Sequence, residues 1–164
     1  MNHDVWDQEA ETFDGEPDHG LTDPAVRAAW RELLLSALPA APALVADLGC
    51  GTGTIARLLT DEGYTVDGLD FSPQMIQRAR AKVPESRFVV ADAATPDLPA
   101  AAYDVVFSRH VLWAMTDPAE AFGRWLKLLK PGGIAVLVER NWSTGAGLTA
   151  AQTEQIVLQA RDEV

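Results

Sequence analysis

An apolar run that ends in a glycine cluster places the tightest constraint on how this chain can fold. The run and its turn span Val45–Gly53, and the residues from Thr54 onward have the pattern of a helix. Glycine tolerates positive φ and has no Cβ, so the backbone can turn sharply here and a ligand can lie against it. A strand that feeds a helix through such a turn is expected to point open N–H groups above the strand's carboxyl end. The stretch therefore predicts a nucleotide site of the kind found in open α/β sheets.

The spacing of the glycines selects among nucleotide-binding motifs. Gly49 and Gly51 fit the dinucleotide fingerprint G-x-G-x-x-G, but its third position falls on Thr54, and the additional glycine is Gly53. The phosphate loop G-x-x-x-x-G-K-[ST] does not occur in the sequence. The string D-L-G-C-G-T-G, residues 47–53, instead resembles motif I of the class I S-adenosylmethionine-dependent methyltransferases. The residues that this resemblance assigns to cofactor binding here are Asp47, Gly49, Cys50, Gly51 and Gly53.

Apolar strands alternate with helices through the rest of the chain. The predicted strands cover residues 44–48, 65–69, 87–91, 103–107 and 134–138. The predicted helices cover residues 23–38, 54–62, 72–82, 117–130 and 149–164, the fourth ending at the Pro-Gly-Gly of residues 131–133. Nearly continuous apolar strands separated by helices predict a mostly parallel sheet covered on both faces. The expected fold is a doubly wound, three-layer α/β/α sandwich, the Rossmann-like methyltransferase fold.

The chain is expected to form a single domain. Its predicted parts are an acidic N-terminal segment (1–22), an N-terminal helix (23–38), the α/β core (44–138) and a C-terminal helix (149–164). The resembling family continues its sheet into a sixth strand and an antiparallel seventh, which this sequence lacks. Either the chain is a shortened form, which we favour, or the fifth strand is an edge that needs cover.

Two aspartates follow successive strands and are candidate contacts to a nucleoside. Asp70 lies 21 residues after Gly49, close to the ~20 at which an acid meets a ribose in related folds. The resemblance assigns Asp70 to the ribose hydroxyls and Asp92, with the N–H of Ala93, to the adenine. The alternative is that both aspartates only begin a turn or a helix. Phe71 and Met75 follow Asp70 and are expected beside the adenine or in the core.

The N-terminal segment is acidic and carries isolated aromatic residues. Eight Asp or Glu residues precede the first basic residue, Arg27. The pattern around Trp6 and Phe13 resembles the segment that caps the cofactor in small-molecule methyltransferases, in which tyrosine usually stands at the position of Phe13. The segment is interpreted as a lid, with plain packing as the alternative.

The residues after the fourth strand would form the catalytic rim of this fold. Ser108 is expected at the cofactor, and His110 is a candidate general base because imidazole titrates near neutrality. A packing role for His110 is equally compatible with the sequence. No [DNS]-P-P-[FYW] tetrad follows the strand, which argues against nucleobase or glutamine methylation, and no acid stands at Ser108 or Arg109, which argues against a magnesium-dependent catechol type. The three histidines are far apart in the sequence, and no metal site is predicted.

Composition restricts the partners. A net charge of −11 argues against a nucleic-acid ligand. No apolar run reaches the ~18 residues of a membrane span, and the single cysteine, Cys50, favours a cytoplasmic protein without an internal disulfide. Cys50 is interpreted as a small buried residue rather than a nucleophile.

The resulting functional prediction is methyl transfer from S-adenosylmethionine to a small-molecule acceptor, with S-adenosylhomocysteine as the product. A NAD-binding oxidoreductase and a non-catalytic cofactor-binding module are the alternatives. The sequence does not identify the acceptor, and it leaves a homodimer open.

Overall fold

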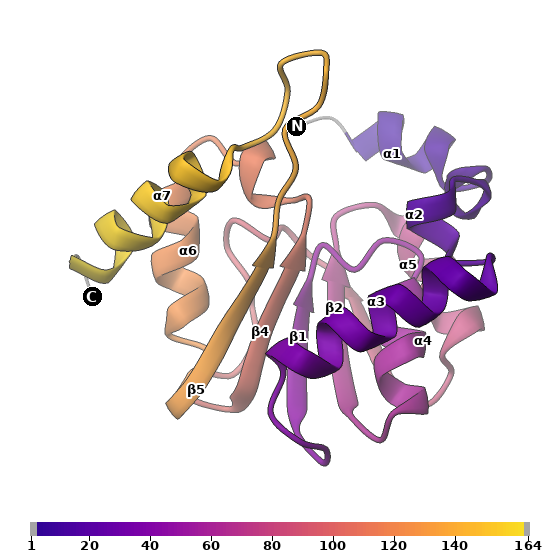
Figure 1. Cartoon of the computed structure of the whole chain (residues 1–164), viewed down its shortest axis with the longest axis horizontal. Helices are drawn as coiled ribbons and strands as arrows, with labels where there is room; N and C mark the ends of the chain where they lie inside the picture. The colour runs from indigo at the N-terminus through magenta and orange to yellow at the C-terminus, as the bar shows by residue number, and fades with distance from the viewer. Residues whose placement is uncertain (1–2, 163–164) are drawn as a thin grey trace.

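A parallel sheet forms the centre of the computed structural model, which describes residues 3–162 (Figure 1). Its five strands have the order β3-β2-β1-β4-β5 and are all parallel. The strands are β1 (Leu44–Leu48), β2 (Thr65–Asp70), β3 (Arg87–Val90), β4 (Tyr103–Arg109) and β5 (Leu129–Val138). The helices are α1 (His3–Glu9), α2 (Pro17–Gly20), α3 (Pro24–Ala37), α4 (Thr54–Asp61), α5 (Pro73–Lys82), α6 (Pro118–Leu126) and α7 (Ala150–Asp162), with short 3-10 helices η1 (Phe13–Gly15) and η2 (Leu112–Ala114).

Helices cover both faces of the sheet. On one face, Leu34 of α3, Leu59 of α4 and Ile76 of α5 belong to a single apolar cluster with the strand residues beneath them. On the other face, Trp125 of α6 and Ala160 of α7 belong to a second cluster. Figure 1 shows α6 and α7 on one side of the sheet and α4 and α5 on the other. The predicted three-layer α/β/α sandwich is therefore confirmed.

Three helices begin where the sequence predicts, each at a polar cap followed by proline. Asp23 Oδ1 accepts hydrogen bonds from the first turn of α3 at 2.8 and 3.1 Å. Ser72 Oγ accepts from α5 at 3.1 Å, and Asp117 Oδ1 accepts from α6 at 2.9 Å. These caps satisfy N–H groups that a helix start otherwise leaves unpaired.

The segment before β5 differs from the sequence prediction. Helix α6 ends at Leu126, not at the Pro-Gly-Gly, and β5 begins at Leu129 rather than Ile134. Tyr103 of β4 pairs with Leu129 and Val105 pairs with Ile134, so β5 advances five residues where β4 advances two. The additional residues form a bulge, in which Gly132 has φ +81°. Pro131 fits because β5 is an edge strand, where a missing N–H donor leaves no ladder bond unmade.

The two edge strands of the sheet belong to the described part of the chain. Strands β3 and β5 occupy the two edges, and no further strand lies between residues 3 and 162. In the same part of the chain, no helix combines the length and the apolar character needed to cross a bilayer.

Trp125 joins α6 to the turn that follows β3. Its side chain is fully buried, and its Nε1 donates to the carbonyl oxygen of Ala93 at 2.6 Å. The bond satisfies an indole N–H that has no access to water. The position of the turn at Ala93 therefore depends on the packing of α6.

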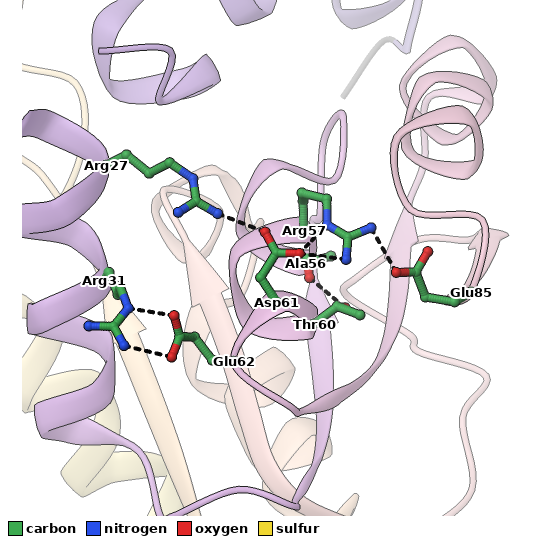
Figure 2. A network of polar contacts seen from close by, with 8 residues as sticks. All are labelled: Arg27, Arg31, Ala56, Arg57, Thr60, Asp61, Glu62 and Glu85. Carbon is green, nitrogen blue, oxygen red and sulfur yellow. Dashed lines mark hydrogen bonds and ion pairs between the residues drawn. The ribbon is translucent and has the colours of Figure 1, made fainter. Parts of the chain in front are cut away.

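A network of charged side chains joins α3 to the end of α4 on the surface (Figure 2). Asp61 pairs with Arg27 at 2.9 Å and with Arg57 at 2.7 Å. Arg31 and Glu62 form a bidentate pair beside it. The side chains of Arg27 and Asp61 are 37% and 44% exposed, so solvent screens these pairs.

We expect the buried indole bond to contribute more to stability than the surface network. Trp125→Phe should lower the free energy of unfolding by about 1–3 kcal/mol, because it leaves a buried carbonyl without its donor. Asp61→Asn should lower the free energy of unfolding by less, and this decrease should be smaller still in 1 M sodium chloride. Urea unfolding of both variants at low and high salt measures these differences. A larger loss for Asp61→Asn than for Trp125→Phe would contradict the assignment.

Candidate active site

A cavity of about 300 Å³ opens at the carboxyl ends of the strands. The register pairs Leu48 of β1 with Leu69 of β2, and Asp47 of β1 with Phe107 of β4, so these strands end at the same edge. Most residues that the sequence analysis singled out line the cavity. They are Asp47, Gly49, Cys50, Gly51, Asp70, Phe71, Met75, Asp92, Ala93 and His110, with Trp6 and Phe13 from the N-terminal segment.

The glycine turn is held by β2. Gly49 N and Cys50 N both donate to the carbonyl oxygen of Leu69, at 2.8 and 2.9 Å, and Gly51 N donates to Asp70 Oδ2 at 3.0 Å. The expectation of open N–H groups is therefore wrong for these three residues. The backbone of β2 occupies the first two N–H groups, and the Asp70 side chain occupies the third. The loop instead offers a ligand its side-chain-free surface.

Two glycines of the turn have positive φ and lie close to side chains from other parts of the chain. Gly49 has φ +76°, and a Cβ there would collide with Val111. Gly51 has φ +53°, and a Cβ there would meet the Phe13 ring at 3.5 Å inside the cavity. A ligand can therefore approach the backbone closely at Gly51.

Gly53 and Ser108 are absent from the cavity lining, unlike the other expected residues. A Cβ on Gly53 would lie 3.0 Å from Ala79 Cβ, so this glycine allows α4 to begin close against α5. Ser108 is fully buried, and its Oγ has no partner within residues 3–162.

Two carboxylates follow β2 and β3 in the cavity wall. Asp70 is 8% exposed, and its oxygens accept from Gly51 N and Ser72 N at 3.0 and 2.9 Å. Burial raises the pKa of Asp70, and the two backbone bonds oppose this increase. Asp92 is exposed, and its Oδ1 accepts from Ala94 N at 2.8 Å. Both retain oxygen lone pairs for a ligand, since a carboxylate has about four acceptor sites.

Asp47 lies at the base of the cavity without full compensation of its charge. It is 2% exposed, and its Oδ2 has no hydrogen-bond partner among the described residues. Burial raises the pKa of Asp47 to about 7, although the nearby Arg109 guanidinium lowers it. Cys50 beside it remains a thiol, because burial and the two neighbouring aspartates raise its pKa.

His110 follows β4 in an unusual backbone conformation. Its φ is +59°, which is strained for a residue with a side chain, and its Nδ1 is buried without a partner in the described part of the chain. Burial, together with the charges of Arg109, His19 and Arg140, lowers its pKa to about 4. The ring is therefore neutral at pH 7.

Two tryptophans complete this end of the cavity. Trp113 Nε1 donates to the His110 carbonyl at 2.9 Å. The Trp142 ring lies edge-on to both Trp113 and His110, at 5.4 and 5.3 Å between centroids. Trp142 belongs to the loop after β5 and carries no local sequence signal for a site.

The N-terminal segment covers the cavity. Trp6, Phe13 and His19 line it, and the rings of Phe13 and His19 are stacked with their centroids 4.1 Å apart. Figure 1 shows α1, α2 and the loop after β5 at the same end of the sheet. His19 and Arg109 also lie in the lining, although the sequence analysis assigned them no role.

Two aspartates attach this segment to the core. Asp7 accepts from the hydroxyl of Ser72, at the start of α5. Asp14 pairs with Lys82 at 2.6 Å, and Lys82 also donates to Thr54 Oγ1 at 2.9 Å. The N-terminal segment is therefore attached through these polar contacts and through buried Leu21, which belongs to the apolar cluster on one face of the sheet.

No group of three or more His, Cys, Asp or Glu residues between positions 3 and 162 has the arrangement of a metal site.

Comparison with known proteins assigns the family. The methyltransferase domain model matches residues 46–137. Trans-aconitate 2-methyltransferase of Methylobacterium radiotolerans is 41% identical over 105 residues, 63% of this chain and 40% of that protein. Demethylmenaquinone methyltransferase of Renibacterium salmoninarum is 30% identical over 78% of this chain and 54% of that protein. The chain thus spans about half or less of the length of these curated relatives.

Solved structures agree with this assignment. The complex of the Haloferax volcanii Trm112 methyltransferase activator and a putative methyltransferase matches 96% of this chain and 74% of that chain, with 26% identity and a TM-score of 0.74. Phosphoethanolamine N-methyltransferase 1 of Haemonchus contortus, crystallised with S-adenosylhomocysteine, shares the fold with 20% identity and a TM-score of 0.68, over 92% of this chain and 35% of that chain. Because the family model matches more than half of the chain, this protein belongs to the class I S-adenosylmethionine-dependent methyltransferase family.

Proposed function

We propose that this chain binds S-adenosylmethionine in the cavity and transfers its methyl group to a small-molecule acceptor. One observation carries the proposal: the glycine turn, Asp70 and Asp92 line one cavity, at the ends of three neighbouring strands. The unpartnered Oδ2 of Asp47 and the absence of a side chain at Gly51 support a ligand with polar groups in the cavity. The names of the curated relatives support small-molecule acceptors.

The residues divide the cavity into two ends. At one end, Asp70 accepts hydrogen bonds from the ribose hydroxyls and Asp92 accepts one from the adenine amine, with Phe71 and Met75 as apolar walls. When bound, the cofactor would supply a sulfonium methyl group: a nucleophile of the acceptor attacks the methyl carbon, and the thioether S-adenosylhomocysteine leaves. The acceptor lies at the end with Trp113 and Trp142. Holding two reactants in register accounts for about 7–11 kcal/mol of such a barrier.

His110 is the candidate proton acceptor at the acceptor end. It lines the cavity, and its neutral ring has a free lone pair at pH 7. A pKa of about 4 makes the ring a weak base, so His110 can assist only an acceptor that loses its proton readily. Trp142 holds the ring by an edge-on contact.

The N-terminal segment acts as a lid over the filled cavity, and the whole chain is one methyltransferase domain. A cytoplasmic location and a homodimer remain predictions from the sequence.

Asp70→Ala should weaken S-adenosylhomocysteine binding by about 30- to 1000-fold, because two charge-assisted hydrogen bonds are lost. Asp70→Asn should have a smaller effect, since it preserves shape and one acceptor oxygen. The control is Asp104→Ala, which removes a carboxylate near the amino end of β4. Titration calorimetry measures the affinities, and NAD should give no binding heat. Unchanged affinity in Asp70→Ala, or NAD binding of equal strength, would disprove the proposal.

Acidification should destabilise the wild type more than His110→Gln. The unfolded chain protonates His110 below about pH 6.5, whereas the folded protein does so only near pH 4, so stability falls as pH decreases through this window. Asp18 is the one neighbour that opposes the effect of Arg109, His19 and Arg140 on this ring. The difference between the two proteins should change by about 1–2 kcal/mol between pH 7 and 4, reduced from the full linkage value by partial exposure. Urea unfolding at several pH values tests this, and parallel pH profiles would show that His110 is not held neutral.

Hydrogen exchange in residues 5–13 should slow when S-adenosylhomocysteine binds, because a weakly attached cover gains contacts with the filled cavity. Asp14→Asn, which weakens the bond to Lys82, should increase exchange in the free protein. Exchange measured by mass spectrometry provides the readout. Identical protection with and without ligand would mean that the segment is ordinary packing.

A further inference from the structure

Two histidines from distant parts of the chain line the cavity together. His19 belongs to α2 in the N-terminal segment, and His110 directly follows β4. The residues that precede them are bonded to each other, because Arg109 Nη1 donates to the Asp18 carbonyl oxygen at 2.6 Å. The two rings are also close enough that His19 lowers the pKa of His110. The hydrogen bond therefore keeps the two histidines on neighbouring parts of the cavity wall.

Aromatic contacts hold both imidazole rings in place. The His19 ring stacks on Phe13, with the centroids 4.1 Å apart and the planes inclined by 8°. The His110 ring lies edge-on to Trp142 at 5.3 Å, and its backbone N–H donates to the Val138 carbonyl at 2.8 Å. The Nδ1 atom of each ring is buried without a hydrogen-bond partner within residues 3–162. Because buried polar atoms are normally paired, two such rings in one cavity wall indicate a ligand with hydrogen-bonding groups.

The two rings are neutral at pH 7. Burial and the Arg109 charge lower the pKa of His19. Glu16, Asp18 and a backbone carbonyl of the same segment oppose this shift. The pKa of His110 is lower still, at about 4. A neutral imidazole has one N–H donor and one acceptor nitrogen, so a pair of them matches a hydroxyl group, which donates and accepts, better than a carboxylate, which only accepts.

The surroundings of the two histidines favour an uncharged aromatic molecule. Arg109 also lines the cavity, but Asp47, Asp18 and Asp14 each raise its pKa against the larger effect of burial. An anion at Arg109 would therefore also be repelled by these carboxylates. The other lining residues from the N-terminal segment, from positions 111–116 and from the loop after β5 are uncharged, and the larger ones are Trp6, Phe13, Trp113, Met115 and Trp142. A planar ring fits such walls through stacked and edge-on contacts.

We propose that the acceptor is a hydroxylated aromatic molecule whose hydroxyl group is held between the imidazole rings of His19 and His110. The His19 ring donates to the hydroxyl oxygen, and the His110 ring accepts a hydrogen bond from the hydroxyl group. An aromatic hydroxyl group loses its proton more readily than an aliphatic one, which suits a weak base. The inference rests on the proposed function and extends it to the chemical class of the acceptor. It also makes the N-terminal segment, through His19, a part of acceptor recognition.

Fluorine NMR titration of the protein saturated with S-adenosylhomocysteine tests the proposal. The probes are 4-fluorophenol, 4-fluorotoluene and 4-fluorobenzoate, which share one ring and carry a hydroxyl group, a methyl group of similar size and a carboxylate. The wild type should bind 4-fluorophenol about 10- to 100-fold more tightly than either of the other probes, the equivalent of two hydrogen bonds. The readout is binding, so it does not require turnover.

Variants of the two histidines separate their contributions. His19→Phe keeps an aromatic ring beside Phe13 but removes both ring nitrogens. It should reduce the preference for 4-fluorophenol over 4-fluorotoluene by about 3- to 10-fold, the equivalent of one hydrogen bond, without weakening the binding of 4-fluorotoluene. His19→Asn retains a donor and an acceptor and should keep part of the preference. His110→Phe should reduce the preference to a similar extent.

Glu11→Gln is the matched control. It removes the charge of an exposed side chain of the same segment that is absent from the cavity lining, so the preference should not change. Titration calorimetry with S-adenosylhomocysteine on each variant shows whether the cofactor site is intact.

The outcomes separate this inference from the proposed function. Equal binding of 4-fluorophenol and 4-fluorotoluene, or no saturable binding of 4-fluorophenol, would overturn the inference while S-adenosylhomocysteine still binds. Tighter binding of 4-fluorobenzoate would overturn it in favour of an anionic acceptor. An unchanged preference in His19→Phe, or equal weakening of all three probes, would also overturn it and leave His19 a structural role only. Failure of the wild type to bind S-adenosylhomocysteine would overturn the proposed function itself.

Discussion

The geometry of the site depends on the hydrogen bonds that the carbonyl oxygen of Leu69 accepts from the glycine turn. It accepts from both Gly49 N and Cys50 N, and so fixes the glycine turn to the end of β2. With the turn held there, Gly51 N reaches Asp70, and α4 begins directly behind the loop. Parallel strands end at one edge, so this bond brings the turn and the acids after β2 and β3 around a common space.

Uncompensated charge is concentrated at one end of that space. Asp47 and Arg109 face each other without an ion pair in the described chain, and His110 lies beside them with a strained backbone and an unpartnered nitrogen. Each of these features costs folding free energy, because buried polar groups are normally paired. Such costs are typical of sites where a ligand completes the interactions. The stability of this part of the fold is therefore expected to depend on ligand binding.

The cover contributes contacts of a different kind. Trp6, Phe13 and His19 add aromatic surface to the cavity, but the attachment to the core uses Asp7 and Asp14. Polar contacts at a partly exposed interface add little stability. Leu21, at the end of the segment, belongs to the apolar cluster with Leu34 and Ile76, so it anchors the segment at that point. Trp125, fully buried on the other face, holds the turn at Ala93 independently of the segment.

The local signals in the sequence were sufficient for the fold and for the residues at the strand ends. Apolar runs, proline-bearing caps and the glycine turn depend on neighbours in the chain, so they predicted β1 to β4, the starts of α3, α5 and α6, and a cavity wall containing Asp47, Asp70 and Asp92. The α6–β5 boundary was wrong, because only the edge position of β5 makes a Pro-Gly-Gly bulge acceptable inside a strand.

Only the tertiary structure determined which side chains, besides those at the strand ends, line the cavity. Trp142 and His19 come from loops and a short helix distant in sequence, and no periodicity marks them. The N–H groups of the glycine turn were expected to be open, but pairing with β2, a long-range contact, occupies those of Gly49 and Cys50. The electrostatic interaction of Asp47 with Arg109 likewise exists only because β1 lies beside β4, since such an interaction depends on proximity in space and not along the chain.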